Sequence, residues 1–162
     1  MAQLTKGIGH VARATADLDR LVEFYEGAFG AEVSERHDGD PRHCFIRIGK
    51  GTVLHVFEMP RAVPSHLRPW RHGPIDHFTL EAADLDAFVT IRERLRERNC
   101  ADDAVTDFGS LVSVFFRDPD GLLLELSLWK TQPWDPPFEV TPFRGRAGAG
   151  GDGAGGDGGA AR

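Results

Sequence analysis

The sequence is poor in cysteine and has no long apolar run. Of its 162 residues only two are cysteines, Cys44 and Cys100, and they show no paired spacing. The simplest interpretation is a cytoplasmic protein with both thiols reduced, because structural disulfides are rare in that compartment. No stretch approaches the roughly 18 apolar residues of a membrane span, and Met1–Lys6 lacks the apolar core of a signal peptide. We therefore expect no membrane partner.

An excess of positive charge is also absent. The chain has 19 Lys and Arg against 25 Asp and Glu, which gives a formal net charge of −6 and a pI near 5.6. A general nucleic-acid binder would instead show a basic stripe, so we expect no nucleic-acid partner. The length suits one compact domain or two small modules that share a core.

Glycine is concentrated at the end of the chain. Residues 145–162 are half glycine, and such a segment buries too little apolar surface to offset its ordering entropy. We expect a disordered tail there. Residues 132–144 are rich in proline and aromatic residues, and we expect them to run extended over the surface. The folded domain is then residues 1–131.

A histidine and a glutamate recur at one spacing. His10 and Glu58 are separated along the chain by the same number of positions as His77 and Glu125. The recurrence predicts two similar structural units, each with one imidazole and one carboxylate. If the units face each other, the four side chains can converge on one divalent metal ion. The offset between the two pairs also relates other parts of the chain, namely Ile8 to Ile75 and Ala16–Asp19 to Ala83–Asp86.

Each unit shows the same order of elements. Asp17 is a typical helix N-cap and Gly30 a typical helix stop, with apolar residues at helical spacing between them, and Asp84 begins a second helix of this kind. We predict two βαβββ modules, at 7–59 and 75–130, joined by a connector at 60–74, in the α+β class. The predicted strands lie at 7–14, 31–36, 43–48, 52–59, 75–81, 104–108, 111–117 and 122–129.

Strand parity bears on where the carboxylates point. In the last strand Leu122, Leu124, Leu126 and Leu128 share one side, suited to packing on the helices, and Glu125 lies on the other. A glutamate on a buried strand needs a partner, since an unpaired buried carboxylate is costly. A metal would supply one, although an arginine of the connector could pair with Glu58, and Glu125 could sit at a sheet edge. His55 has the opposite parity to Glu58 and is expected to face away from it.

These patterns resemble those of a known family. The resemblance covers about Gly7 to Trp129 and identifies the chain as a member of the vicinal oxygen chelate superfamily, which includes glyoxalase I, fosfomycin and bleomycin resistance proteins, methylmalonyl-CoA epimerase and extradiol dioxygenases. It implies two βαβββ modules whose curved sheets form a metal-binding cleft. The segments that carry it are Gly9–Val11, Asp17–Arg20, Phe24–Tyr25, Phe29–Gly30, Ile75–His77, Phe116–Gly121 and Leu124–Leu126.

The resemblance also implies a site and a reaction. The first and fourth strands of each module would lie side by side, bringing His10 next to Glu58 and His77 next to Glu125. Zn²⁺, Ni²⁺, Fe²⁺, Co²⁺ or Mn²⁺ suits such ligands. Four filled positions most resemble glyoxalase I, which implies a metal-dependent lyase or isomerase acting on a small oxygenated molecule. Glu58 or Glu125 would serve as general base.

Two other functions are compatible with the same residues. An Fe²⁺-dependent extradiol-type dioxygenase is one, although a carboxylate at Glu58 would occupy positions that O₂ and catechol need. A bleomycin-resistance-like protein that binds a drug or metabolite without catalysis is the other, with Trp70 and Trp129 available to stack on an aromatic ligand.

The connector and the expected assembly concern the partners of the site. The connector is basic and would suit an anionic substrate, although a solvated linker is the competing interpretation. We expect a homodimer, in which the two donor pairs meet either within one chain or across two. The basic residues of the connector are Arg61, His66, Arg68, Arg71 and His72.

Overall fold

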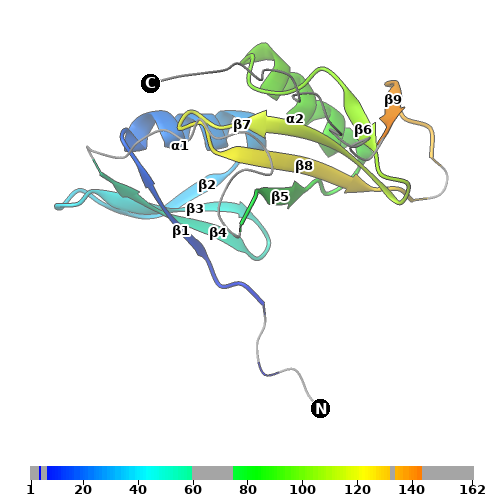
Figure 1. Cartoon of the computed structure of the whole chain (residues 1–162). Helices are drawn as coiled ribbons and strands as arrows, with labels where there is room; N and C mark the ends of the chain where they lie inside the picture. The colour runs from blue at the N-terminus through cyan, green and yellow to red at the C-terminus, as the bar shows by residue number, and fades with distance from the viewer. Residues whose placement is uncertain (1–3, 5–6, 60–74, 132–133, 144–162) are drawn as a thin grey trace, which may run out of the picture.

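Two similar α+β modules make up the folded part of the chain (Figure 1). The structure is a computed structural model and describes residues 4, 7–59, 75–131 and 134–143. The predicted connector at 60–74 and the glycine-rich tail at 145–162 lie outside the described residues. The first module holds β1 (Val11–Thr15), α1 (Leu18–Phe29), β2 (Glu32–His37), β3 (His43–Gly49) and β4 (Thr52–Glu58). The second holds β5 (Phe78–Glu81), α2 (Leu85–Glu97), β6 (Val105–Asp107), β7 (Leu111–Arg117), β8 (Leu123–Trp129) and β9 (Val140–Pro142).

Local signals in the sequence set the limits of both helices. The Asp17 carboxylate accepts a hydrogen bond from the Arg20 N–H at 3.0 Å, and the Asp84 carboxylate accepts one from the Ala87 N–H at 2.8 Å. Both are N-caps, which satisfy amides that have no partner inside the helix. Gly30 ends α1 in the left-handed conformation, with φ of 64°.

Each helix covers one face of its own sheet. The first sheet has the strand order β1-β4-β3-β2 and the second has β5-β8-β7-β6-β9. In both, the first strand of the module runs parallel to the last strand of the βαβββ unit. The predicted α+β class with two βαβββ modules is confirmed. We call the face of each sheet that points away from its helix the far face.

The core joins the two modules. Helices α1 and α2 contact each other and lie along the same side of the molecule (Figure 1). Rings of Phe24 and Phe29 on α1 pack against Phe116 on β7, with centroids 6.4 Å and 5.4 Å apart. In the described part of the chain, no helix is long and apolar enough to span a membrane.

Strand β9 was not predicted as a strand. The proline-rich segment was expected only to run extended, and its residues Val140, Thr141 and Pro142 in fact pair in parallel with β6. Trp134 and Phe138 pack against the core beside it. The segment therefore adds a fifth strand to the second sheet.

Candidate functional site

His77 and Glu125 lie together on the far face of the second sheet. His77 Nε2 is 3.0 Å from Glu125 Oε2, and His77 Nδ1 is 2.8 Å from Asp76 Oδ2. The parallel pairing of β5 with β8 sets Thr79 opposite Glu125, which brings His77, two residues earlier, into reach of the carboxylate. The sequence-predicted pair in the second module is therefore a contact in the structure.

The Glu125 carboxylate is buried and held in place. Its residue is only 8% exposed, and the Thr79 hydroxyl donates a hydrogen bond to Oε2 at 2.9 Å. The ring of Phe115, which lies opposite Glu125 on β7, meets the His77 ring edge-on at 5.4 Å between centroids. An imidazole oriented by a carboxylate on its other nitrogen is a common setting for a metal ligand, and Asp76 supplies that carboxylate.

The first module does not bring its predicted pair together. The register of β1 and β4 sets Val11 opposite Leu54 and Thr15 opposite Glu58. His10 precedes β1, whereas Glu58 ends β4, so the two residues are at opposite ends of this parallel pair. The expectation that adjacent strands would place His10 next to Glu58 is wrong, because adjacency of the strands does not fix their register.

Glu58 has a different set of contacts. Its Oε1 accepts a hydrogen bond from the Leu18 N–H at 2.9 Å, at the first turn of α1, and Arg42 forms an ion pair with Oε2 at 3.0 Å. Leu54 and Val56, on the same side of β4, are buried in the core against the helix. Glu58 thus points toward the helical side of its sheet, while Glu125 points toward the far face of the other.

His55 occupies the place where Glu58 was expected. Its ring lies 5.6 Å from the ring of His10, between centroids, and is stacked on Phe45 at 4.0 Å. Its Nε2 is buried and has no hydrogen-bond partner among the residues that the structure describes. Burial, with smaller effects of His43 and His10, lowers the pKa of His55, so the ring is neutral near pH 7 and able to offer a lone pair.

Strand register, unlike residue identity, relates His55 to Glu125. Val11 on β1 pairs with Leu54 on β4, and Phe78 on β5 pairs with Leu124 on β8, so these two pairs hold equivalent positions in the two modules. Val11 and Phe78 keep the offset that relates His10 to His77, whereas Leu54 and Leu124 are further apart than that offset. His55 follows Leu54 as Glu125 follows Leu124. The alternation of side chains along the two strands distinguishes the two glutamates. Glu58 shares a side of β4 with core residues, while Glu125 lies on the side of β8 opposite to the leucines.

The described residues contain two separate donor pairs. His10 and His55 lie in the first module, and His77 and Glu125 lie in the second. Within the ranges 7–59, 75–131 and 134–143, no group of three or more His, Cys, Asp or Glu is close enough to hold a metal ion. The donor types nevertheless suit a transition metal, and the buried His55 nitrogen without a partner fits a ligand role.

Comparisons with known proteins agree with this architecture. Residues 7–126 match the family model described as Glyoxalase/Bleomycin resistance protein/Dioxygenase superfamily. A mitochondrial methylmalonyl-CoA epimerase from Mus musculus is 28% identical over 127 residues, covering 74% of this chain and 71% of that protein.

Solved structures share the fold. A glyoxylase/bleomycin resistance protein/dioxygenase domain from a Frankia species has a TM-score of 0.67 at 20% identity, covering 78% of this chain and 99% of that one. A lactoylglutathione lyase from Agrobacterium tumefaciens has a TM-score of 0.57 at 25% identity, covering 82% and 100%. With the family model matching well over half of the sequence, the resemblance noted from the motifs is confirmed, and the chain belongs to the Glyoxalase/Bleomycin resistance protein/Dioxygenase superfamily.

Proposed function

We propose that the protein is a divalent-metal-dependent enzyme of the lyase or isomerase type that acts on a small oxygenated molecule. The observation that carries this proposal is the His77–Glu125 pair, with its 3.0 Å contact and with Asp76 on the other ring nitrogen. The similarity to an epimerase and to a lyase supports this reaction class.

The proposed ligands are His10 and His55 of the first module and His77 and Glu125 of the second. Of the four residues expected from the sequence, His55 replaces Glu58, because Glu58 is bound by Arg42 and by the Leu18 amide on the helical side of its sheet. Zn²⁺, Ni²⁺, Fe²⁺, Co²⁺ and Mn²⁺ suit this nitrogen-rich set. Such an ion would act as a Lewis acid and stabilise an oxyanion or enolate.

The residues around the ligands have supporting roles in this proposal. Asp76 would orient the His77 ring, and Thr79 would hold the Glu125 carboxylate against the sheet. We assign the general-base role to Glu125 and no longer to Glu58, since Glu125 is buried next to the imidazole while Glu58 faces another part of the molecule. A carboxylate positioned beside a reacting group can serve as a general base.

Metal content is the direct test of the proposal. Elemental mass spectrometry on protein purified without chelator or nickel resin should find close to one equivalent of a transition metal. His77→Ala and Glu125→Ala should each lose it, because each removes a ligand that the rest of the site cannot replace. Protein that neither carries nor takes up Zn²⁺, Ni²⁺, Fe²⁺ or Mn²⁺ would refute the metal-dependent mechanism and favour the binding-protein alternative.

Mixing of variants tests how the two donor pairs meet. A His10→Ala chain and a His77→Ala chain each lack one pair. If the pairs meet across a homodimer, exchange of subunits should restore metal binding in part of the population. If they meet within one chain, no metal should be regained although exchange is demonstrated, for example by mass spectrometry of mixed dimers.

A further inference from the structure

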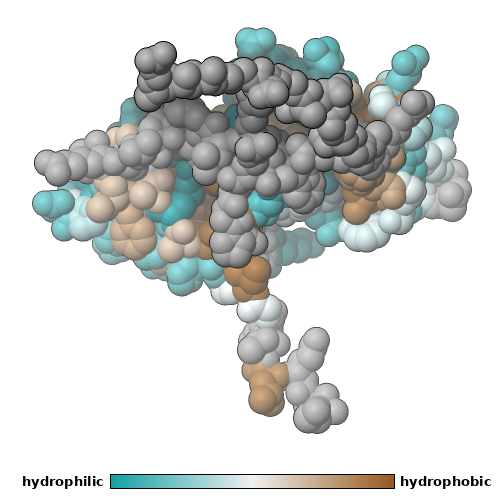
Figure 2. All heavy atoms as spheres, in the orientation of Figure 1, coloured by the Kyte–Doolittle hydropathy of each residue, from teal (hydrophilic) through white to brown (hydrophobic). Residues whose placement is uncertain are grey.

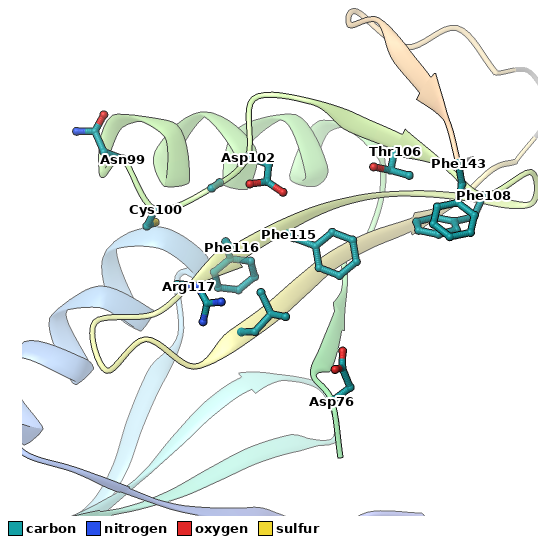
Figure 3. Close-up of a pocket in the computed structure, with 12 residues that line it drawn as sticks. Asp76, Asn99, Cys100, Asp102, Thr106, Phe108, Phe115, Phe116, Arg117 and Phe143 are labelled. Carbon is teal, nitrogen blue, oxygen red and sulfur yellow. The ribbon is translucent and has the colours of Figure 1, made fainter. Parts of the chain in front are cut away.

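A cavity of about 600 Å³ lies on the far face of the second sheet, beside the candidate site (Figure 3). Its lining includes Asp76 and Phe115, which both contact His77. Leu123 and Arg117 line it along β8 and β7. Most of its lining is apolar, so a ligand that fills it must offer apolar surface.

Two aromatic rings line one end of this cavity, opposite the end lined by Asn99 and Cys100 (Figure 3). Phe108 follows β6 and Phe143 follows β9, and their ring centroids are 4.7 Å apart. Both rings are unusually accessible for their size, with Phe108 37% and Phe143 53% exposed. Figure 2 shows hydrophobic residues at the end of the molecule that carries β9.

The backbone holds the Phe143 ring at this position. Three residues of β9 pair in parallel with β6, and the Phe143 N–H donates a hydrogen bond to the Asp107 carbonyl at 2.8 Å. Strand β9 lies beyond the family match, which ends at residue 126. Of the two rings, Phe143 therefore lies outside the matched region and Phe108 lies within it.

We propose that this cavity binds a ligand with an aromatic ring, that the ring stacks on Phe108 and Phe143, and that this pair selects the substrate of the neighbouring site. The reacting end of the ligand would point toward His77 and Glu125, a statement that rests on the function proposed above. Phe115 contacts the His77 ring, and Asp107, which precedes Phe108, pairs with Val112. Phe115 and Val112 are three residues apart along β7, a separation of roughly 10 Å between their backbone positions. An aryl group with a short chain has about this length.

Ring stacking explains why the ligand is aromatic. Aromatic pairs gain about 0.5–1.5 kcal/mol beyond the burial of their area, and two adjacent phenyl rings offer a third ring both a face and an edge. An aliphatic acid of the same chain length lacks this contribution. The pair should thus discriminate by ring content as well as by size.

Binding of two probes tests the proposal. Titration of the protein with 4-phenylbutyrate and with butyrate, followed by ¹H–¹⁵N NMR, gives both the affinity and the location of binding. We expect the phenyl acid to bind more tightly and to shift the amides of Thr106, Phe108 and Phe115. Phe143→Ala should weaken the phenyl acid about fivefold to tenfold and leave butyrate unchanged, with Phe143→Leu in between and Phe108→Ala similar to Phe143→Ala.

Met59→Ala is the matched control, since Met59 is 46% exposed in the first module and does not line the cavity. It should bind both probes as the unaltered protein does. Equal affinity for the two acids, or shifts away from this cavity, would overturn the proposal. Metal content is measured in parallel. If the Phe143 variants lose the preference for the phenyl acid and retain the metal, the proposed function is unaffected. If the protein prefers the phenyl acid but binds no metal, the aromatic site is supported and only the proposed metal-dependent function is refuted.

Discussion

At the residue scale, Glu58 and Glu125 have the same spacing from a histidine and different surroundings. Glu125 is 8% exposed and contacts His77 and Thr79 on the far face. Glu58 accepts from the Leu18 amide and pairs with Arg42 on the helical side. Spacing along a chain does not fix the direction of a side chain, because a shift of one residue on a strand reverses the face.

This contrast leads to a prediction for substitutions at Glu58 and His55. Glu58→Gln should retain the metal and cost less than about 1 kcal/mol of stability, because the amide oxygen still accepts from Leu18 and only a partly exposed ion pair with Arg42 is lost. His55→Phe preserves the stacked ring and removes the nitrogen ligand, so it should lose the metal. Elemental mass spectrometry and urea denaturation measure the two effects.

Glu58→Ala serves as a comparison for stability, since it removes both contacts and leaves the Leu18 amide without its acceptor. Metal lost from Glu58→Gln and kept in His55→Phe would reverse our assignment and restore the ligand set that the spacing alone predicts.

At the scale of elements, most of the secondary structure could be predicted because its signals are local. The caps at Asp17 and Asp84, the stop at Gly30 and the apolar spacing between them define both helices without any tertiary information. Strand β9 could not be predicted in this way. Its three residues are a strand only because they pair with β6, which lies far earlier in the chain and is separated from β9 by both β7 and β8.

The candidate site was predictable in one module for a related reason. In β8 the leucine side was clear, so the position of Glu125 followed from parity. In the first module the corresponding residue depends on the register of β1 against β4, which pairs Ala12 with His55. Register depends on loop length and packing, and an offset measured from identical residues does not report it.

The C-cap of α1 provides a prediction at this scale. Gly30→Ala should destabilise the protein by about 1 kcal/mol, because φ of 64° at this position strains any residue with a Cβ atom. The added methyl would meet no atom within 4 Å, so the effect is on the backbone alone. Gly49→Ala in β3 also has open space around the methyl and lacks a positive φ. It should leave the urea midpoint nearly unchanged, and an equal loss in both variants would contradict the capping role.

The end of the second sheet provides a prediction on pH. Hydrogen bonds from Lys130 and from the Gly109 amide lower the pKa of Asp107. A lowered pKa in the folded state means that this ion pair stabilises the protein above the ordinary pKa of an aspartate, near 3.9, and that the contribution is lost as pH falls through the lowered value. Lys130→Met should therefore lower Tm at pH 7 and change it little near pH 2. A Tm difference that is the same at both pH values would count against this pairing.

At the scale of the whole molecule, one buried network connects the modules. Arg13 on β1 forms ion pairs with Asp118 and Asp120, in the turn between β7 and β8. The Tyr25 hydroxyl on α1 donates to Asp118 at 3.3 Å. Burial disfavours the charge on Arg13, yet the interactions with Asp118, Tyr25 and Asp120 together outweigh this and raise the pKa of the guanidinium. The ion pairs of Arg13 thus link the sheet of the first module to the sheet of the second, although the residues are far apart in the sequence.

Breaking this network should be among the most costly single changes in the chain. Arg13→Met leaves Asp118, whose side chain is fully buried, without its cation, and we expect a loss of about 3–5 kcal/mol in urea denaturation. The double variant Arg13→Met, Asp118→Asn should recover part of that loss. The side-chain oxygen of the asparagine can still accept hydrogen bonds from the backbone N–H groups of Asp120 and Leu122, and the side chain carries no charge. As a control, Arg36→Met breaks an exposed pair with Asp19 and should cost less than about 1 kcal/mol. A cost of that small size for Arg13→Met would mean that apolar packing of Phe24 and Phe29 on Phe116, and not the ion pairs, holds the modules together.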